Sequence, residues 1–214
     1  MEIKTFYFNE LRTCCYILSD ETKECVIIDP GCASKSEHDR FIKYVETNGL
    51  KPVALLNTHG HFDHVMGNNF VMTTWDVKLY ISEKDVALLK KAKSYGEYFG
   101  YQIEDIPEGD NIITISDNDI IKFGNSELKV IASPGHTPGG VAFYSQSGNV
   151  LFSGDSLFAG SIGRTDLPGG DLDQLMDSLE NKLLKLDGQC KVLPGHGPES
   201  TIGIEIETNP FLRF

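Results

Sequence analysis

The segment Thr58-His59-Gly60-His61-Phe62-Asp63-His64 constrains this chain more than any other stretch of its sequence. It places three imidazoles and a carboxylate within six residues, a density of metal-ligating groups that seldom arises by chance. His59 and His61 are two residues apart, so in an extended segment their side chains point the same way. Asp63 and His64 can join them only if the chain turns after His61. The segment therefore predicts a metal site on a loop that bends.

Three further segments carry groups of the same kind. His136 lies in Ser-Pro-Gly-His-Thr, Asp155 in Ser-Gly-Asp-Ser, and His196 in Leu-Pro-Gly-His-Gly. Each follows a predicted strand, in a loop where side chains can converge without breaking a hydrogen-bond ladder. Of the six histidines, only His38 stands apart, in a polar helix start, and we assign it no role. Asp155 taken alone could equally be a turn residue or a helix cap.

The types of side chain indicate which metals the site would bind. Imidazole and carboxylate without thiolate suit zinc, iron or manganese. One tetrahedral ion takes only four ligands, so a set of seven implies two ions, and the two oxygens of Asp155 make it the natural bridge. The candidate ligands are His59, His61, Asp63, His64, His136, Asp155 and His196.

Two other polar residues lie close to these segments in sequence. Asp29, in Asp-Pro-Gly, is either a turn residue or a hydrogen-bond partner of a ligating histidine, and we favour the second. Arg164 and Asp166 are expected to pair with each other, in preference to a direct contact between Arg164 and substrate.

Composition narrows the functional class. The chain has 214 residues, 40% of them hydrophobic, which suits one domain over residues 1–214 or two tightly fused halves. Its net charge of −12 would repel a nucleic-acid backbone. We find no apolar run long enough to span a membrane and no apolar secretory segment after Met1. The five cysteines form no Cys-x-x-Cys pair, so we expect free thiols in a reducing cytoplasm.

The hydrophobic pattern alternates short strands with a few helices. The stretch Tyr95–Asp117 has no regular pattern and predicts a surface loop near the mouth of the site. Strands followed by helices, twice over, predict two β-sheets packed together with helices outside. Strands are expected at Lys4–Phe8, Cys14–Ser19, Glu24–Asp29, Pro52–Asn57, Lys78–Ile81, Ile120–Phe123, Leu128–Ala132, Val141–Tyr144, Val150–Ser153 and Cys190–Leu193, and helices at Ser36–Asn48, Met66–Trp75, from Ser82, at Asp171–Leu186 and before Pro210.

The order of these histidine and aspartate segments resembles that of the metallo-β-lactamase superfamily over nearly the whole chain. The resemblance implies an α/β (α+β) fold, a four-layered αβ/βα sandwich of two mixed sheets with helices outside. It also implies that one metal takes His59, His61 and His136. A second metal would take Asp63, His64 and His196, with Asp155 and a hydroxide bridging the two.

Within that superfamily the chain is most similar to glyoxalase II, the hydroxyacylglutathione hydrolases, and their shorter relatives. The segments Ser153–Phe158 and Gly163–Asp166 carry this likeness. It implies hydrolysis of S-2-hydroxyacylglutathione thioesters by a metal-bridging hydroxide, with Asp63 and Asp155 as catalytic carboxylates. The implied cofactors are two divalent transition-metal ions, zinc first and iron or manganese as alternatives. Glyoxalase II has a further helical domain beyond the point matching Phe214, so a loose grip on the thiol carrier is expected here.

Other members of the superfamily define the alternatives. Persulfide dioxygenases share the Gly-Arg-Thr-Asp segment and hold one iron through residues matching His59, His136 and Asp155. Lactonases use the same seven ligands, whereas the Pro-Gly-His-Gly segment around His196 favours a hydrolase over the dioxygenase. True β-lactamases are disfavoured because many carry cysteine at the place of Asp155, and nucleases are disfavoured by the acidic charge. A metal-storing module is the non-enzymatic alternative. The expected partners are a small acyl thioester and at most a second copy of the chain in a homodimer, with neither nucleic acid nor membrane.

Overall fold

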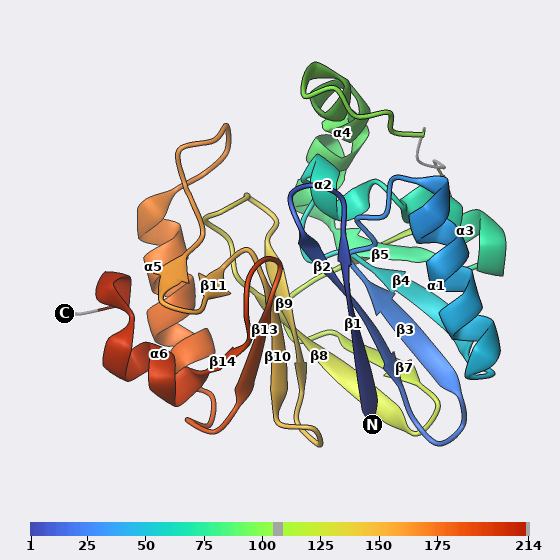
Figure 1. Cartoon of the computed structure of the whole chain (residues 1–214). Helices are drawn as coiled ribbons and strands as arrows, with labels where there is room; N and C mark the ends of the chain where they lie inside the picture. Colours follow the sequence, from blue (N-terminus) through green and yellow to red (C-terminus); the bar gives the residue numbers. More distant parts are fainter. Residues whose placement is uncertain (105–108, 213–214) are drawn as a thin grey trace. The chain divides into compact units, whose positions relative to one another are not determined.

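Two mixed six-stranded sheets form the framework of the chain (Figure 1). This computed structural model describes residues 1–104 and 109–212. The chain divides into two compact units, whose described residues fall within Met1–Ile81, Val86–Thr114 and Lys122–Ser126 for the first, and within Ser82–Asp85, Ile115–Ile121 and Glu127–Phe214 for the second. A single domain over residues 1–214 stays a prediction.

The first unit contains a sheet in the order β1-β2-β3-β4-β5-β6. Its strands are β1 (Glu2–Phe8), β2 (Thr13–Ser19), β3 (Glu24–Ile28), β4 (Lys51–Leu56), β5 (Leu79–Ser82) and β6 (Ile112–Ile115). The first three are antiparallel, whereas β3, β4 and β5 run parallel to one another. Parallel neighbours need a crossover, and helices supply it. The carboxyl ends of β3 and β4 therefore lie at the same edge of this sheet.

The helices of the first unit are α1 (Lys35–Thr47), α2 (Phe62–Val65), α3 (Asn68–Trp75) and α4 (Val86–Tyr98). Helices α1 and α3 lie along one face of the sheet (Figure 1). Phe41 of α1 is fully buried and meets Phe6 and Phe8 of β1 edge to face, at ring-centroid distances of 5.0 and 5.6 Å. Such edge-to-face pairs stabilise a core beyond the area they bury.

A second sheet, most of which belongs to the second unit, has the order β14-β13-β10-β9-β8-β7. Its strands are β7 (Ile120–Phe123), β8 (Ser126–Ala132), β9 (Val141–Ser145), β10 (Val150–Gly154), β13 (Lys191–Pro194) and β14 (Ser200–Thr201), with a separate hairpin of β11 (Leu157–Phe158) and β12 (Ser161–Ile162). Strands β10 and β13 are parallel, joined through helix α5 (Leu172–Asn181). The carboxyl ends of these two strands therefore lie at the same edge of the second sheet.

Helix α5 buries Leu175 and Leu179 against this second sheet, and Leu183 of the short helix η2 (Leu183–Lys185) continues the same stripe. Leucines three and four residues apart lie on one side of a helix, which explains the packing. The remaining helices are η1 (Glu83–Asp85), α6 (Ile202–Thr208) and η3 (Pro210–Leu212). Helix α6 starts at Thr201, whose side chain accepts a hydrogen bond from the backbone N–H of Ile204.

Several elements depart from the sequence-based expectation. The irregular loop predicted over Tyr95–Asp117 is wrong in part, because α4 continues to Tyr98 and β6 adds an edge strand to the first sheet. Residues 105–108 of this predicted loop lie outside the residues that the structure describes. The helix expected over Asp171–Leu186 ends at Asn181, since Lys182 leaves helical geometry at φ −128° and ψ −67°. Helix α1 is capped by Ser34, in a capping box with Glu37, and begins one residue before the expected Ser36.

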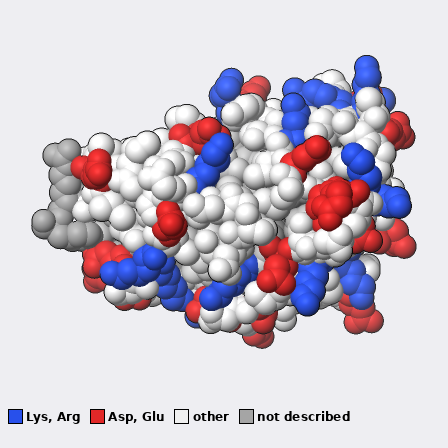
Figure 2. All heavy atoms as spheres, turned by 90° about the horizontal axis from the view of Figure 1, so that it is seen from below, with Lys and Arg blue, Asp and Glu red and all other residues white. Residues whose placement is uncertain are grey.

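The five cysteines are all buried free thiols, as the sequence indicates. Burial raises the pKa of the Cys25 thiol to about 12, so it behaves as a small apolar side chain. On the face that Figure 2 shows, basic and acidic side chains are interspersed. Among the described residues no helix has the length and apolarity to cross a membrane.

Candidate metal centre

In the first unit, the ends of β3 and β4 bring Asp29 beside the histidine-rich loop. The backbone N–H of Asp29 donates to the carbonyl of Leu56, at 3.0 Å, at the point where both strands end. Asp29 itself has a φ of 49°, in the left-handed region that aspartate tolerates better than most residues. The chain leaves β3 in a tight turn, and this turn directs the Asp29 carboxylate towards the loop after β4.

Asp29 is buried and accepts hydrogen bonds on both carboxylate oxygens. Its Oδ1 accepts from the backbone N–H of Thr58 at 2.8 Å, and its Oδ2 accepts from the Thr58 hydroxyl at 2.6 Å. The same Oδ2 lies 3.0 Å from Nδ1 of His64. Asp29 is therefore both a turn residue and the hydrogen-bond partner of a candidate ligand, the two roles that the sequence allowed.

These bonds decide which nitrogen of each ring carries the proton. A carboxylate only accepts, so His64 must donate from Nδ1, and its Nε2 then offers a lone pair. The Thr58 hydroxyl donates its only proton to Asp29. It therefore accepts a hydrogen bond from Nδ1 of His59, which lies 3.0 Å from the hydroxyl oxygen. Asp29 therefore presents Nε2 of His64 directly, and Nε2 of His59 through Thr58, as metal-ligating atoms.

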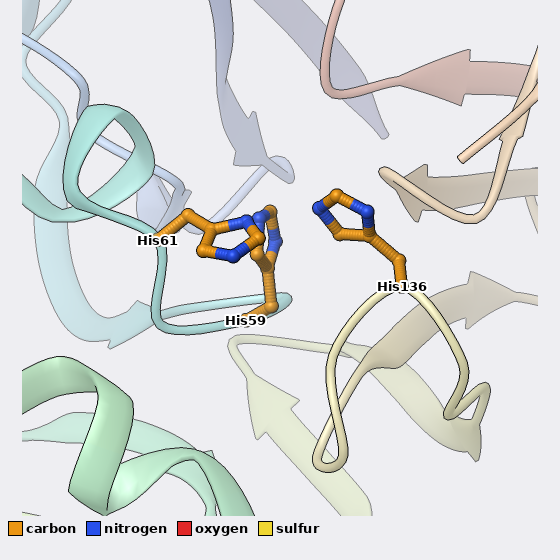
Figure 3. A group of neighbouring side chains, drawn as sticks. All are labelled: His59, His61 and His136. Carbon is orange, nitrogen blue, oxygen red and sulfur yellow. The ribbon is translucent and has the colours of Figure 1, made fainter. Parts of the chain in front are cut away.

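The other two residues of the loop lie beside these rings. The ring of His61 meets that of His59 edge on, with centroids 4.8 Å apart, and Figure 3 shows both on the loop after β4. Helix α2 provides the turn that the sequence required after His61, and its Asp63 places Oδ2 3.4 Å from Nε2 of His64. The Thr13 hydroxyl donates to the same Oδ2 at 3.1 Å.

The second unit positions its three candidate ligands on loops at the ends of its strands. Asp155 follows β10 and His196 follows the parallel β13, while His136, also drawn in Figure 3, follows β8. Oδ2 of Asp155 lies 3.6 Å from Nε2 of His136 and 3.7 Å from Nε2 of His196. One carboxylate thus stands between two imidazoles, the arrangement expected of a bridging ligand.

Short bonds connect these three loops. The Ser133 hydroxyl donates to that of Ser156 at 2.8 Å, and the N–H of Gly195 donates to the carbonyl of Gly154 at 2.7 Å. Gly163 passes so close to this site that a Cβ would lie 1.9 Å from the carbonyl oxygen of Asp155. Any side chain there would therefore displace the Asp155 loop.

Arg164 acts on this site through its backbone. Nδ1 of His136 donates to the Arg164 carbonyl at 2.7 Å, which leaves Nε2 as the ligating atom. The guanidinium instead makes two 2.8 Å bonds to Asp166, as the sequence suggested, and holds the pKa of that exposed carboxyl down at about 2. No sequence pattern predicts the role of the carbonyl.

Asp85 is a positioning residue that the sequence did not reveal. It is fully buried, and it accepts from the Thr137 hydroxyl at 2.8 Å and from the N–H of Gly139 at 2.7 Å. It thereby holds the loop that carries His136. Its place in Ser-Glu-Lys-Asp predicted only a helix start, since its partners lie more than 50 residues away.

Comparison with known proteins identifies the family. The model of the metallo-β-lactamase superfamily matches residues 9–196. The hydroxyacylglutathione hydrolase GloC of Haemophilus influenzae is 35% identical over 214 residues, which cover 100% of this chain and 99% of that protein. The probable metallo-hydrolase YqgX of Bacillus subtilis is 36% identical over 198 residues, or 92% and 90% of the two chains.

Solved structures agree with this assignment. The B3 metallo-β-lactamase BLEG-1 has a TM-score of 0.89 at 37% identity, over 99% of each chain. TTHA1623 in a di-iron-bound form has a TM-score of 0.87 at 37% identity, over 98% of this chain and 100% of that one. ETHE1 from Myxococcus xanthus has a TM-score of 0.79 at 25% identity, over 98% and 84%.

The fold class predicted from the sequence, the metallo-β-lactamase fold with two mixed sheets flanked by helices, is confirmed. The clusters of histidine and aspartate suit divalent metal ions, and the two named curated relatives are a hydroxyacylglutathione hydrolase and a probable metallo-hydrolase. The chain belongs to the metallo-β-lactamase superfamily.

Proposed function

We propose that the protein is a binuclear metallo-hydrolase that cleaves thioesters of the S-2-hydroxyacylglutathione type. The observation that carries the proposal is the similarity to GloC over the full length of both chains. The ligand types add support, because the loops that follow strands in both units hold imidazoles and carboxylates. Metal-dependent hydrolysis, without a named substrate, follows from membership of the family.

The chemistry of the donors fits two cations. We assign His59, His61 and His136 to one and Asp63, His64 and His196 to the other, with Asp155 shared. Three of these rings have Nδ1 engaged by Asp29, Thr58 or the Arg164 carbonyl, so each presents Nε2. Nitrogen and oxygen donors suit zinc, and the di-iron form of TTHA1623 makes iron the principal alternative.

When bound, such cations lower the pKa of a coordinated water and polarise the acyl carbonyl. The protein's own side chains position the reacting groups. Oδ2 of Asp155 lies near Nε2 of both His136 and His196, so this carboxylate would be shared by the two cations. Asp63 is held through Oδ2 by Thr13, and we assign its Oδ1 to accept the proton that the attacking water releases.

The reaction itself needs no further reactant. A C–O bond forms between water and the acyl carbon, and the C–S bond breaks. The hydroxyl of the water ends in the 2-hydroxy acid, and its other proton goes to the departing thiolate. No cysteine or serine nucleophile is required, and the buried cysteines with raised pKa values are unsuited to that task.

The test compares reactions on one metal-loaded preparation. Thiol release from S-lactoylglutathione and oxygen uptake with glutathione persulfide are followed side by side, with a homoserine lactone and a cephalosporin as further substrates. We expect rapid thiol release, no oxygen uptake, and a strong loss of rate in Asp63→Asn. Cleavage confined to the lactone or the cephalosporin would reject the thioester assignment.

The persulfide dioxygenase is the second candidate, because the Gly163–Asp166 segment is common to both groups. Metal content separates the two. A binuclear hydrolase should carry close to two ions per chain by elemental analysis, and His196→Ala should lower that number. A value of one that is insensitive to His196, together with oxygen uptake, would establish the dioxygenase.

A further inference from the structure

Four aromatic rings lie around the end of helix α4, all within the first unit. The rings of Phe62 and Phe99 are stacked with centroids 5.5 Å apart, and Tyr101 lies 5.6 Å from Phe62 on a tilted plane. Tyr98 meets Phe99 edge on at 5.2 Å. We call Phe62, Phe99 and Tyr101, with Tyr98 at their outer edge, the aromatic surface.

This surface begins within the candidate metal-binding segment. Phe62 stands between His61 and Asp63 and opens helix α2. Gly96 of α4 lies beside the Phe62 ring, since a Cβ there would be in ordinary contact with it at 3.6 Å, and glycine is required because the same Cβ would lie 2.1 Å from the Ile103 side chain. Phe62 thus joins the histidine-rich loop to the end of α4.

Tyr101 shares the surroundings of a candidate ligand. Its pKa is raised by burial first, then by the negative charges of Glu10 and Asp63. The rings thus extend from Phe62, which stands between His61 and Asp63 in the sequence, to the exposed Phe99 and Tyr98.

The outer rings are unusually exposed for their type. The exposed fraction is 83% for Tyr98 and 61% for Phe99. Adjacent exposed aromatic rings often mark a place where something apolar binds. The rings carry no positive charge to pair with the two carboxylates of glutathione, and the stacked Phe62 and Phe99 have no hydrogen-bond donor. An apolar acyl side chain is the part of the substrate that suits them.

We infer that the aromatic surface receives the acyl side chain of the substrate, which would make the enzyme selective for 2-hydroxyacyl thioesters with an aromatic or branched apolar side chain. The inference rests on the proposed function and names its substrate class. Phe62 and Phe99 make the main contact, and Tyr101 lies beside Phe62.

The kinetic test compares S-mandeloylglutathione with S-lactoylglutathione. We expect kcat/KM to favour the mandeloyl substrate, and Phe99→Ala to reduce that preference about 3- to 10-fold, the range measured for aromatic pairs. Phe99 is largely exposed, so its removal should leave the fold intact. Phe211→Ala, in a ring of similar exposure (54%) on η3, is the matched control and should keep the wild-type ratio. An unchanged ratio in Phe99→Ala would overturn the inference.

A binding measurement separates this inference from the proposed function. Mandelate and lactate are titrated calorimetrically into the metal-loaded protein and into Phe99→Ala. Tighter binding of mandelate that depends on Phe99 supports the aromatic surface even if no thioester is cleaved, in which case only the proposed reaction fails. Thioester cleavage with equal binding of both acids would overturn the aromatic surface and leave the hydrolase standing.

Discussion

Among single residues, Asp29 has the widest influence on the candidate centre. One carboxylate fixes the tautomer of His64 directly and that of His59 through the Thr58 hydroxyl. It does so from a left-handed backbone conformation, at φ 49°, of the kind that concentrates at functional sites. Two candidate ligands therefore depend on one side chain, which we assign as their hydrogen-bond partner.

Replacing Asp29 by asparagine should weaken metal binding. The amide offers one acceptor oxygen, so it cannot accept from the Thr58 backbone N–H on one side and from the Thr58 hydroxyl and His64 on the other. Changes of this kind typically cost about 10- to 100-fold in affinity. Competition with a chromogenic chelator would measure the effect. Asp39→Asn, an exposed carboxylate paired with Lys35, is the control. Equal affinities for the Asp29 variant and the wild type would refute this role.

The sequence predicts ligands better than it predicts the residues that orient them. The clustered histidines could be named because few other functions need imidazole at that density. Thr58 and Asp85 could not be assigned a role, since threonine and aspartate occur in every turn and their partners here lie 29 and 52 residues away. The seven ligand assignments themselves stay predictions.

At the scale of elements, parallel strand pairs explain where the chemistry lies. In both units a parallel pair, β3 with β4 and β10 with β13, places two functional loops at one edge. In the second unit the chain then returns past Asp155 through Gly163, with room only for a hydrogen at the α-carbon. The closeness of those segments is therefore set by backbone, before any metal binds.

Gly163→Ala should disturb this arrangement. Its methyl group would lie 1.9 Å from the Asp155 carbonyl oxygen, so the backbone must shift, at a cost of about 1–3 kcal/mol. Urea unfolding would give the loss of stability, and metal titration the effect on the site. Gly188→Ala, whose nearest neighbour lies at 3.8 Å, is the control. Equal unfolding midpoints for the two variants would contradict the steric argument.

The turn between β2 and β3 makes a pH-dependent contribution. The Asp20 carboxylate accepts from the Thr22 hydroxyl at 2.5 Å and from the N–H of Asn125 at 2.6 Å, and these bonds, that of Thr22 foremost, hold its pKa down at about 2. A folded-state pKa below the unfolded value stabilises the protein at neutral pH. This contribution is lost as the pH falls from about 4 towards 2.

Asp20→Asn should therefore lower the thermal midpoint at pH 7, and the difference from the wild type should shrink as the pH falls towards 2. Circular dichroism melts at pH 7, 5 and 3 would test this. Glu97→Gln, at an exposed position on α4, serves as the control. A difference that is constant across the three pH values would disprove the electrostatic origin.

Elements differ in how well the sequence predicts them. The apolar runs of β4 and β10 are found because residues 54–56 of β4 and all of β10 are buried. The edge strand β6 and the two-residue strands β11 and β12 are missed, because too few residues alternate to distinguish them from a loop. Helix α2 has only four residues, so periodicity cannot reveal it.

For the whole molecule, metal binding and folding should be linked. Ligands that bind the native state and not the unfolded state raise stability in proportion to the logarithm of their concentration. Removing the metal with a chelator should lower the thermal midpoint, and added zinc should restore it. At free metal about 100-fold above the dissociation constant the gain is about 2.7 kcal/mol.

Calorimetry of the metal-free and the reloaded protein would measure this linkage. His38→Ala, outside the candidate ligand set, is the control and should show the same gain on reloading as the wild type. His64→Ala should show a smaller one. A thermal midpoint that does not change with metal in the wild type would contradict a resident cofactor.

The hydrogen bond between His136 and the carbonyl of residue 164 has an evolutionary consequence. A carbonyl is present whatever amino acid occupies the position, so mutation of the Arg164 codon does not delete the acceptor. The side chain there can drift, or be selected for a new substrate, while the imidazole keeps its orientation. A scaffold that orients its metal ligands through the main chain can acquire new substrate specificities by point mutation. Positions such as Arg164 are where such mutations can occur without loss of the ligand's orientation.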